Sequence, residues 1–111
     1  MGRCWRVVLF PEVAEWVASL TPQDTKIVQR MIAMLEERGN ALRMPHSRPL
    51  GAGLFELRFD LRRGTVAQRV TYFFDGNVVA ITTFQKTRQV ETDQIARARR
   101  AMEEYWREKR T

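Results

Sequence analysis

Three consecutive segments with the alternation of β-strands, joined by tight turns, constrain the fold of this chain more than any other feature. They lie between Leu50 and Thr87, and the turn sequences Arg62-Arg63-Gly64-Thr65 and Asp75-Gly76-Asn77 separate them. An Asp-Gly pair is frequent where a hairpin needs positive φ. Strands joined by such short turns must be antiparallel neighbours. The sequence therefore predicts a three-stranded meander.

The first two of these strands divide their side chains between two faces, because successive residues of a strand point in opposite directions. One face is apolar apart from Gln68 and carries Phe55, Leu57, Phe59, Val66, Val70, Tyr72 and Phe74. The other face carries Glu56, Arg58, Asp60, Arg69 and Thr71. We expect this polar face to meet solvent or a ligand. Two arginines beside a carboxylate could hold a phosphate through forked hydrogen bonds.

Helices are predicted on both sides of the meander. A short strand from Trp5 to Phe10, at an edge or in the centre of the sheet, precedes a first helix with the apolar stripe Val13, Trp16, Val17 and Leu20. A second helix should run from Pro22 to Arg38, with Thr21 as its N-cap and Gly39 as a left-handed C-cap. These two helices should form an antiparallel hairpin across the sheet. A third helix should start near Thr92.

Together these elements predict one α+β domain over residues 1–111, with a mostly antiparallel four-stranded sheet, an N-terminal helix hairpin and a C-terminal helix. The Pro- and Gly-containing segment from Asn40 to Gly53 is predicted to be a loop. No apolar run approaches the roughly 20 residues of a membrane span, and no signal-peptide core is present, so a cytoplasmic location is expected. One histidine and one cysteine cannot form a zinc site, and we expect neither metal nor cofactor.

The positive charge is concentrated in the middle of the chain. The net charge is +6, and residues 40–90 hold eight basic side chains against three acidic ones, whereas the remaining residues hold eleven against ten. The predicted sheet and its loops thus carry almost all of the excess. A localised basic surface suits a polyanion such as nucleic acid, although a basic surface can also serve solubility alone.

The sequence resembles the RelE superfamily of bacterial toxins, and most closely its HigB and phage-derived branch. The residues that carry the likeness are LGAGLFELRF (50–59), QRVTYFF (68–74), FQKT (84–87) and IARARRAMEEY (95–105). The resemblance implies a small RelE/ParE-like fold. It also implies an mRNA endoribonuclease that cuts codons in the ribosomal A site. A helix-turn-helix antitoxin of the HigA type would be its partner.

The resemblance also assigns roles to particular residues. Arg69 matches the arginine that contacts the scissile phosphate, Glu56 and Arg58 match two polar positions of the preceding strand, and Lys86 matches a basic residue after the last strand. Five further arginines are predicted RNA contacts: Arg43, Arg48, Arg62, Arg63 and Arg88.

Cleavage without a metal needs a base, a group that stabilises the charged phosphate, and an acid. Arg58 and Arg69 suit the phosphate, because a guanidinium stays charged at any working pH. Glu56 is one candidate base, although its arginine neighbours weaken it. His46 is the other, because imidazole exchanges protons near neutral pH. Lys86 could be the acid or another phosphate contact.

Three other interpretations remain open. In the first, Glu56 and its arginines form only a cross-strand ion pair that stabilises the sheet by a few tenths to about 1 kcal/mol. A ParE-like toxin of the same architecture would inhibit DNA gyrase without RNA chemistry. A degenerate toxin would keep only RNA or antitoxin binding.

Overall fold

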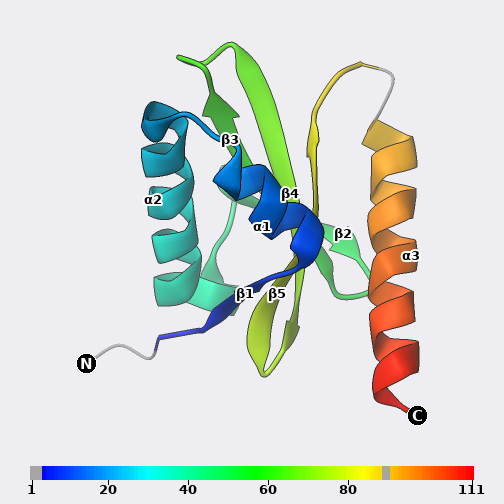
Figure 1. The fold of residues 1–111 in the computed structure, drawn as a ribbon. Coiled ribbons are helices and arrows are strands. Elements are labelled where there is room, and N and C mark those ends of the chain that lie inside the picture. Colours follow the sequence, from blue (N-terminus) through cyan, green and yellow to red (C-terminus); the bar gives the residue numbers. More distant parts are fainter. Residues whose placement is uncertain (1–3, 89–90) are drawn as a thin grey trace.

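The computed structural model describes residues 4–88 and 91–111, which form one central sheet with helices on both of its faces (Figure 1). In chain order the elements are β1 (Val7–Leu9), α1 (Pro11–Ala18), α2 (Pro22–Arg38), the short 3-10 helix η1 (Gly39–Ala41), β2 (Ser47–Gly51), β3 (Leu54–Leu61), β4 (Val66–Asp75), β5 (Asn77–Gln85) and α3 (Glu91–Lys109). The described strands are ordered β1-β5-β4-β3-β2 in the sheet. This architecture confirms the α+β class.

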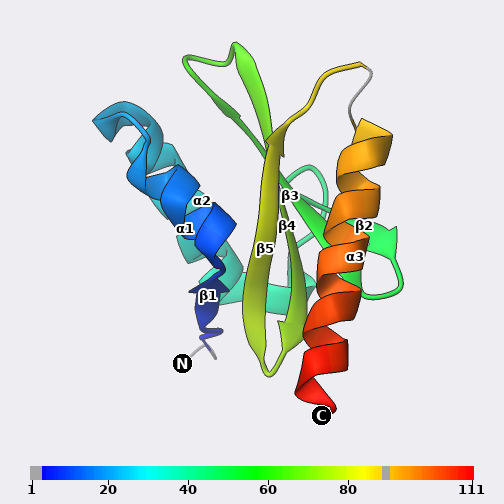
Figure 2. The same ribbon diagram turned by 45° about the vertical axis from the view of Figure 1, so that its right-hand side comes forward.

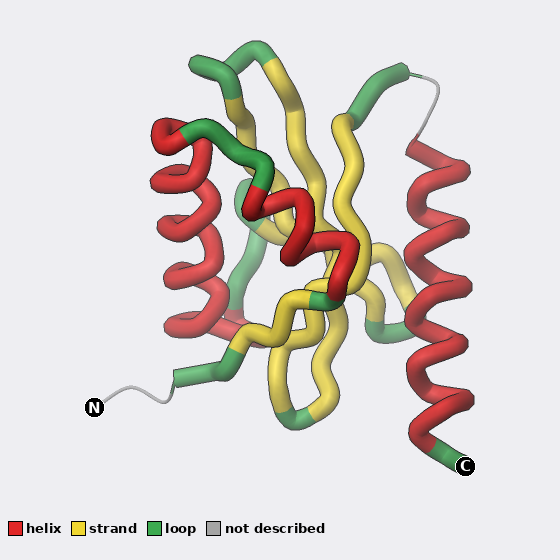
Figure 3. The backbone as a smooth tube through the Cα atoms, in the orientation of Figure 1, coloured by secondary structure: helices red, strands yellow, loops and turns green. Residues whose placement is uncertain are grey.

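The predicted meander is present as β3, β4 and β5, which pair antiparallel in sequence order and run through the centre of the molecule (Figure 3). The short β1 lies at one edge and pairs parallel with β5. The predicted number of four strands was wrong, because β2 pairs antiparallel with β3 where a loop was expected. Pro49 and Gly51 made this segment look like a loop, because proline and glycine are uncommon inside strands. An edge strand tolerates proline, since it need not donate a ladder hydrogen bond on its outer side.

The second helix has the predicted bounds. The side chain of Thr21 accepts a hydrogen bond from the backbone N–H of Asp24, which confirms the N-cap. Gly39 has positive φ at +50°, but its ψ of −122° lies outside the left-handed helical region that was predicted. The glycine is also needed for space, because a Cβ there would lie 2.1 Å from Nε1 of Trp5. The end of α2 is therefore packed against the indole of Trp5.

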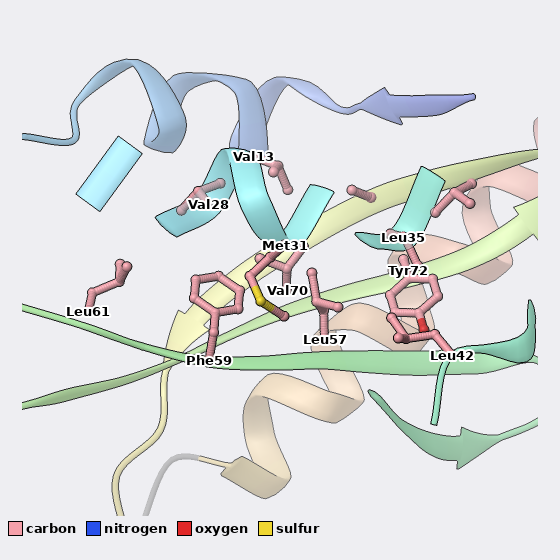
Figure 4. Packing of buried hydrophobic residues seen from close by; sticks show 12 residues of the cluster. Val13, Val28, Met31, Leu35, Leu42, Leu57, Phe59, Leu61, Val70 and Tyr72 are labelled. Atoms are coloured by element: carbon pink, nitrogen blue, oxygen red, sulfur yellow. The ribbon is translucent and has the colours of Figure 1, made fainter. Parts of the chain in front are cut away.

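Helices α1 and α2 cover one face of the sheet and α3 covers the other (Figures 1 and 2). The larger core lies under α1 and α2, where the predicted apolar face of β3 and β4 packs against both helices (Figure 4). Its central residues include Val13, Leu35, Leu57 and Tyr72. The chain reverses between α1 and α2, as predicted, and Figure 1 shows the two helices at an oblique angle to each other.

The face beneath α3 changes character along the strands. Near the start of β3 it is apolar, and Leu54 and Phe73 pack against Ala98 and Met102 of α3. Farther along β3 the same face becomes polar, with Glu56 and then Arg58. Glu56 is fully buried, and Arg69 of β4 is only 6% exposed. The expectation that this face would meet solvent or a ligand was therefore wrong at Glu56 and at Thr71, which are both 0% exposed.

Candidate functional site

Neighbouring strands bring four charged side chains to one place on the face beneath α3. In the ladder between β3 and β4, Arg58 lies opposite Arg69, and in the ladder between β2 and β3, Arg48 lies opposite Glu56. The alternation of the strands puts all four side chains on the same face. We call these residues, Arg48, Glu56, Arg58 and Arg69, the arginine cluster. Its centre was predicted from the sequence, whereas Arg48 had been expected only as a peripheral RNA contact.

The carboxylate of Glu56 is the centre of the arginine cluster. Its Oε1 lies 3.3 Å from Nε of Arg48, 3.7 Å from Nε of Arg69 and 3.9 Å from Nε of Arg58. Both Glu56 oxygens and the three Nε atoms are buried, and none of them has a hydrogen-bond partner among residues 4–88 and 91–111. Burying a charge is costly unless it is both paired and hydrogen-bonded. The attraction therefore holds the arginines near Glu56 without satisfying their Nε donors, although Nη1 of Arg69 donates to the carbonyl of Gln68 at 3.0 Å.

Two further residues extend the arginine cluster toward the start of α3. Nη2 of Arg48 donates a hydrogen bond of 2.8 Å to Oε1 of Glu91, whose other oxygen lies 3.9 Å from Nζ of Lys86. The linked group then contains four cationic side chains and two carboxylates, so two positive charges remain unmatched. Burial lowers the pKa of Arg69, and repulsion from Arg58 lowers it further, against the attraction of Glu56. An anion bound here would relieve that repulsion.

A cleft of about 350 Å³ opens beside the arginine cluster. It is lined by Met44, Pro45, His46, Arg58, Phe59, Asp60 and Arg69. The cleft thus combines two guanidinium groups of the cluster with the one histidine of the sequence. His46 reaches it because β2 pairs with β3, and its carbonyl accepts the backbone N–H of Arg58 at 2.8 Å. The sequence had placed His46 in a loop of unknown position.

The predicted catalytic residues therefore separate into three groups. Arg58, Arg69 and His46 share the cleft. Glu56 lies behind them with no exposed surface, so a ligand in the cleft cannot touch its carboxylate without a rearrangement. Lys86 lies beyond the cleft, next to Glu91. The arrangement can bind an anion through guanidinium groups, with an imidazole close by to accept or donate a proton.

Four of the five predicted RNA contacts lie outside the arginine cluster. Arg43 is exposed, and its side chain donates to the carbonyl of Asn40. Arg62 and Arg63 form the exposed turn between β3 and β4, where both have positive φ. Arg88 is exposed after β5. These arginines can contribute to a basic surface, but the described contacts do not place them in the cleft.

Sequence reasoning missed three residues of the site. Asp60 was placed on the polar face and given no role, yet it lines the cleft. Met44 stood in a predicted loop, and its sulfur lies 3.1 Å from Nη1 of Arg58. Glu91 lies far along the chain from its partner Arg48, and no local pattern indicates such a pair. An acidic residue in the first turn of a helix is ordinarily explained by the helix dipole alone.

A second charged group, the Glu12–Arg97 pair, connects α1 to α3. Nη1 and Nη2 of Arg97 donate to the two oxygens of Glu12 at 2.6 and 2.8 Å, and Glu12 also accepts the backbone N–H of Thr83 at 2.9 Å. Burial would raise the pKa of Glu12, but the hydrogen bonds from Arg97 and Thr83 together lower it. Both residues also line a groove of about 570 Å³ between these helices and β5. In this pair each charge is therefore matched by the other and held by hydrogen bonds.

In the part of the chain that the structure describes, no helix is long and apolar enough to cross a membrane.

Comparison with known proteins places this sheet and its charged face in a family. The model of the family described as phage derived protein Gp49-like (DUF891) matches residues 15–103, from α1 through most of α3. The match therefore includes every member of the arginine cluster and the whole β3–β5 meander. No match was found among curated proteins. Because the matched region covers most of the chain, this protein belongs to the Gp49-like family of phage-derived proteins, a RelE-like toxin family of toxin–antitoxin systems.

Proposed function

We propose that this protein is the toxin of a type II toxin–antitoxin system and acts as a ribosome-dependent mRNA endoribonuclease, similar to the HigB branch of the RelE superfamily. One observation carries the proposal. Three arginines surround a buried carboxylate with two unmatched positive charges, and two of them face a cleft that also holds a histidine. A phosphodiester has the charge and the oxygen geometry that such guanidinium groups recognise.

In the proposed reaction the ribose 2′-oxygen attacks the adjacent phosphorus, and its proton passes to a base. The bond from phosphorus to the 5′-oxygen breaks, and that oxygen takes a proton from an acid. The products are a 2′,3′-cyclic phosphate and a 5′-hydroxyl end. Arg58 and Arg69 stabilise the charge that develops on the phosphate oxygens, and this is ordinarily a large term in such catalysis. Guanidinium groups supply the positive charge that a metal supplies in other nucleases.

His46 is the base that the geometry favours, because its imidazole shares the cleft with both arginines. Glu56 is instead a positioning residue, since its buried carboxylate attracts Arg48, Arg58 and Arg69 from behind. Lys86, 3.9 Å from Glu91, is proposed as a further phosphate contact or as the acid. Among the described residues of the cleft we find no better candidate for the acid that protonates the leaving 5′-oxygen.

The ribosome is proposed to complete the site. The cleft offers anion binding and one imidazole, but it does not enclose an RNA strand. A message held and bent in the decoding site would present its phosphate and 2′-hydroxyl in line, and this positioning can supply much of the rate. Free RNA should therefore be a poor substrate. Equal cleavage rates for free and ribosome-bound message would contradict this part of the proposal.

The experiment uses purified ribosomes programmed with a defined message, and primer extension locates any cut. The wild-type protein should cut within the codon of the A site, whereas Arg69→Ala should cut at least 100-fold more slowly, as expected when one donor to a transition-state oxyanion is lost. Arg63→Ala is the matched control, because it removes the same charge from an exposed turn. Absence of cutting by the wild type, under conditions where it arrests growth, would overturn the proposal.

Assays with the same purified protein also distinguish RNA cleavage from the two rival functions. A gyrase inhibitor would reduce DNA supercoiling by purified gyrase, and Arg69→Ala would not restore it. A degenerate toxin would neither cut RNA nor inhibit gyrase, but would still bind its antitoxin.

The proposed partner is a helix-turn-helix antitoxin of the HigA type. It could cover the arginine cluster or occupy the groove between α1 and α3. Co-expression of the neighbouring gene should restore growth, and substitution of Ala101, which lines the groove, by arginine would show which surface the antitoxin uses. Retained neutralisation of Ala101→Arg would favour the cluster.

A further inference from the structure

Asp60 is an acidic residue in a cleft otherwise suited to an anion. It lies on β3, two residues beyond Arg58 and on the same face, and it lines the cleft together with Arg69 and His46. Its side chain is exposed and, within the described part of the chain, has no ion pair or hydrogen bond at contact distance, although it attracts Arg69 electrostatically. A carboxylate next to a phosphate site reduces anion binding. Its presence there is explained if it binds a different part of the same ligand.

Met44 is a second exposed residue that lines the cleft. It is 56% exposed and is the one large hydrophobic residue with such exposure among the described residues. Its sulfur lies 3.1 Å from Nη1 of Arg58, so a thioether and a guanidinium lie next to each other at the opening. Both groups are polarizable surfaces on which a nucleobase can stack. The cleft volume of about 350 Å³ leaves room for one base.

The spacing of these groups matches the parts of one nucleotide. Residues i and i+2 of a strand are about 7 Å apart, so Arg58 and Asp60 can contact different groups of the same ligand. With the phosphate at Arg58 and Arg69, the base would lie over Met44 and turn its Watson–Crick edge to Asp60. RNA-binding proteins commonly read single-stranded bases by stacking combined with contacts to this edge.

A carboxylate at this position selects among the four bases. It accepts hydrogen bonds and donates none. Guanine presents two adjacent donors on its Watson–Crick edge, N1–H and the N2 amino group, whereas adenine, cytosine and uracil each place an acceptor beside a single donor group. We propose that Asp60 and Met44 form a base-binding subsite that selects guanine next to the phosphate held by the arginine cluster. This inference rests on the proposed RNA substrate and specifies which nucleotide the site prefers.

Binding of guanosine 3′-monophosphate and adenosine 3′-monophosphate, measured by calorimetry on the full chain, tests this subsite without requiring cleavage. The wild type should bind the guanosine nucleotide about tenfold more tightly, the discrimination typical of one bidentate contact. Asp60→Asn should lose most of the preference, because an amide can pair one acceptor and one donor with the edge of adenine (N6–H and N1) or with that of guanine (O6 and N1–H). Asp60→Ala should bind both nucleotides equally. Glu37→Gln is the control: it removes a carboxylate from an exposed position of α2, and this variant should behave as the wild type.

Equal affinities in the wild type, a guanine preference that persists in Asp60→Asn, or no binding of either nucleotide at millimolar concentration would each overturn the inference. Failure of the inference and failure of the proposed function give different results. If ribosome-bound message is cut while guanine is not preferred, the enzyme proposal stands and the subsite is wrong. If guanosine 3′-monophosphate is preferred through Asp60 but no message is cut, the subsite stands and the nuclease proposal is wrong.

Discussion

The arginine cluster and the Glu12–Arg97 pair both join separate elements through charged side chains, yet they are built in opposite ways. In the Glu12–Arg97 pair one guanidinium donates two short hydrogen bonds to one carboxylate, and a backbone N–H adds a third. In the arginine cluster three guanidinium groups share one carboxylate at 3.3–3.9 Å without a hydrogen bond to it. The charges of the Glu12–Arg97 pair are thus matched and hydrogen-bonded, whereas the arginine cluster has Nε donors without a hydrogen bond among the described residues.

This difference indicates what each group does. A closed, bidentate pair binds nothing more, and its effect is to hold α1 against α3. A group with unmatched positive charge and unsatisfied donors is unfavourable in the free protein, and a bound anion would stabilise it. Buried polar groups without partners and unmatched charges occur more often at functional sites than at structural ones. The comparison predicts that changes at the cluster affect RNA cleavage, whereas changes at the pair affect only stability.

Glu56→Gln should have the largest effect. The substitution keeps the shape of the side chain but removes the carboxylate nearest to the buried Arg69 and the half-buried Arg58, while Arg48 keeps Glu91 as a partner. Because the charge of Arg69 is then left buried without its partner, the free energy of unfolding should fall by roughly 3–5 kcal/mol. Urea denaturation measures this change. Added phosphate should restore more stability to Glu56→Gln than to the wild type, because the anion replaces the lost charge. A loss below 1 kcal/mol would mean that the carboxylate does not hold the arginines.

Arg69→Lys comes next and separates charge from geometry. A lysine keeps the positive charge but cannot donate two parallel hydrogen bonds to a phosphate. Cleavage of ribosome-bound message should fall at least about tenfold, with little change in the melting temperature, because the positive partner of Glu56 is kept. Unchanged cleavage would show that Arg69 acts only as a point charge.

Glu12→Gln should lower stability by about 1 kcal/mol at neutral pH and leave cleavage unchanged, since the pair is partly exposed and screened by solvent. Folding lowers the pKa of Glu12 from its ordinary value of 4.5. Its contribution is therefore complete above the unfolded pKa and is lost as the pH falls through the folded pKa. Denaturation curves of wild type and variant should converge as the pH falls below 4.5 and through the lowered pKa of folded Glu12. A difference that persists in acid would point to lost packing instead of lost charge.

Arg63→Ala should have the smallest effect. The residue is exposed in a turn with positive φ, so neither cleavage nor stability depends on its charge. The change in unfolding free energy should stay within about 0.5 kcal/mol, as for most surface substitutions. Loss of cleavage in this variant would mean that the turn contacts the message and that the site is wider than the cleft.

The sequence predicted those features that depend on local pattern. The bounds of α2 follow from Thr21, Pro22 and Gly39, and the shared face of Arg58 and Arg69 on neighbouring strands follows from alternation and a short turn. Features that depend on distant segments were not predictable. The strand at Ser47–Gly51 forms because β3 offers it an edge, and Glu91 meets Arg48 only because α3 packs back over the sheet.

Burial was the other unpredictable property. Glu56 and Arg58 look alike in an alternating strand, as two charged residues on the same face. The structure buries the first completely and leaves the second at the cleft. For that reason the sequence could name Glu56 as a base, whereas we propose His46 as the base and Glu56 as the residue that positions the arginines.

The most direct test of the anion-binding claim is a nuclear magnetic resonance titration that follows the Nε–H signals of the arginines while a short, uncleavable RNA is added. We predict that the signals of Arg48, Arg58 and Arg69 shift, because their guanidinium groups gain the phosphate that the free protein lacks. The signal of Arg97 should stay in place, because its donors are already bonded to Glu12 and Gln94. Unmoved signals from all three cluster arginines, or a shift of Arg97 as large as theirs, would contradict the account.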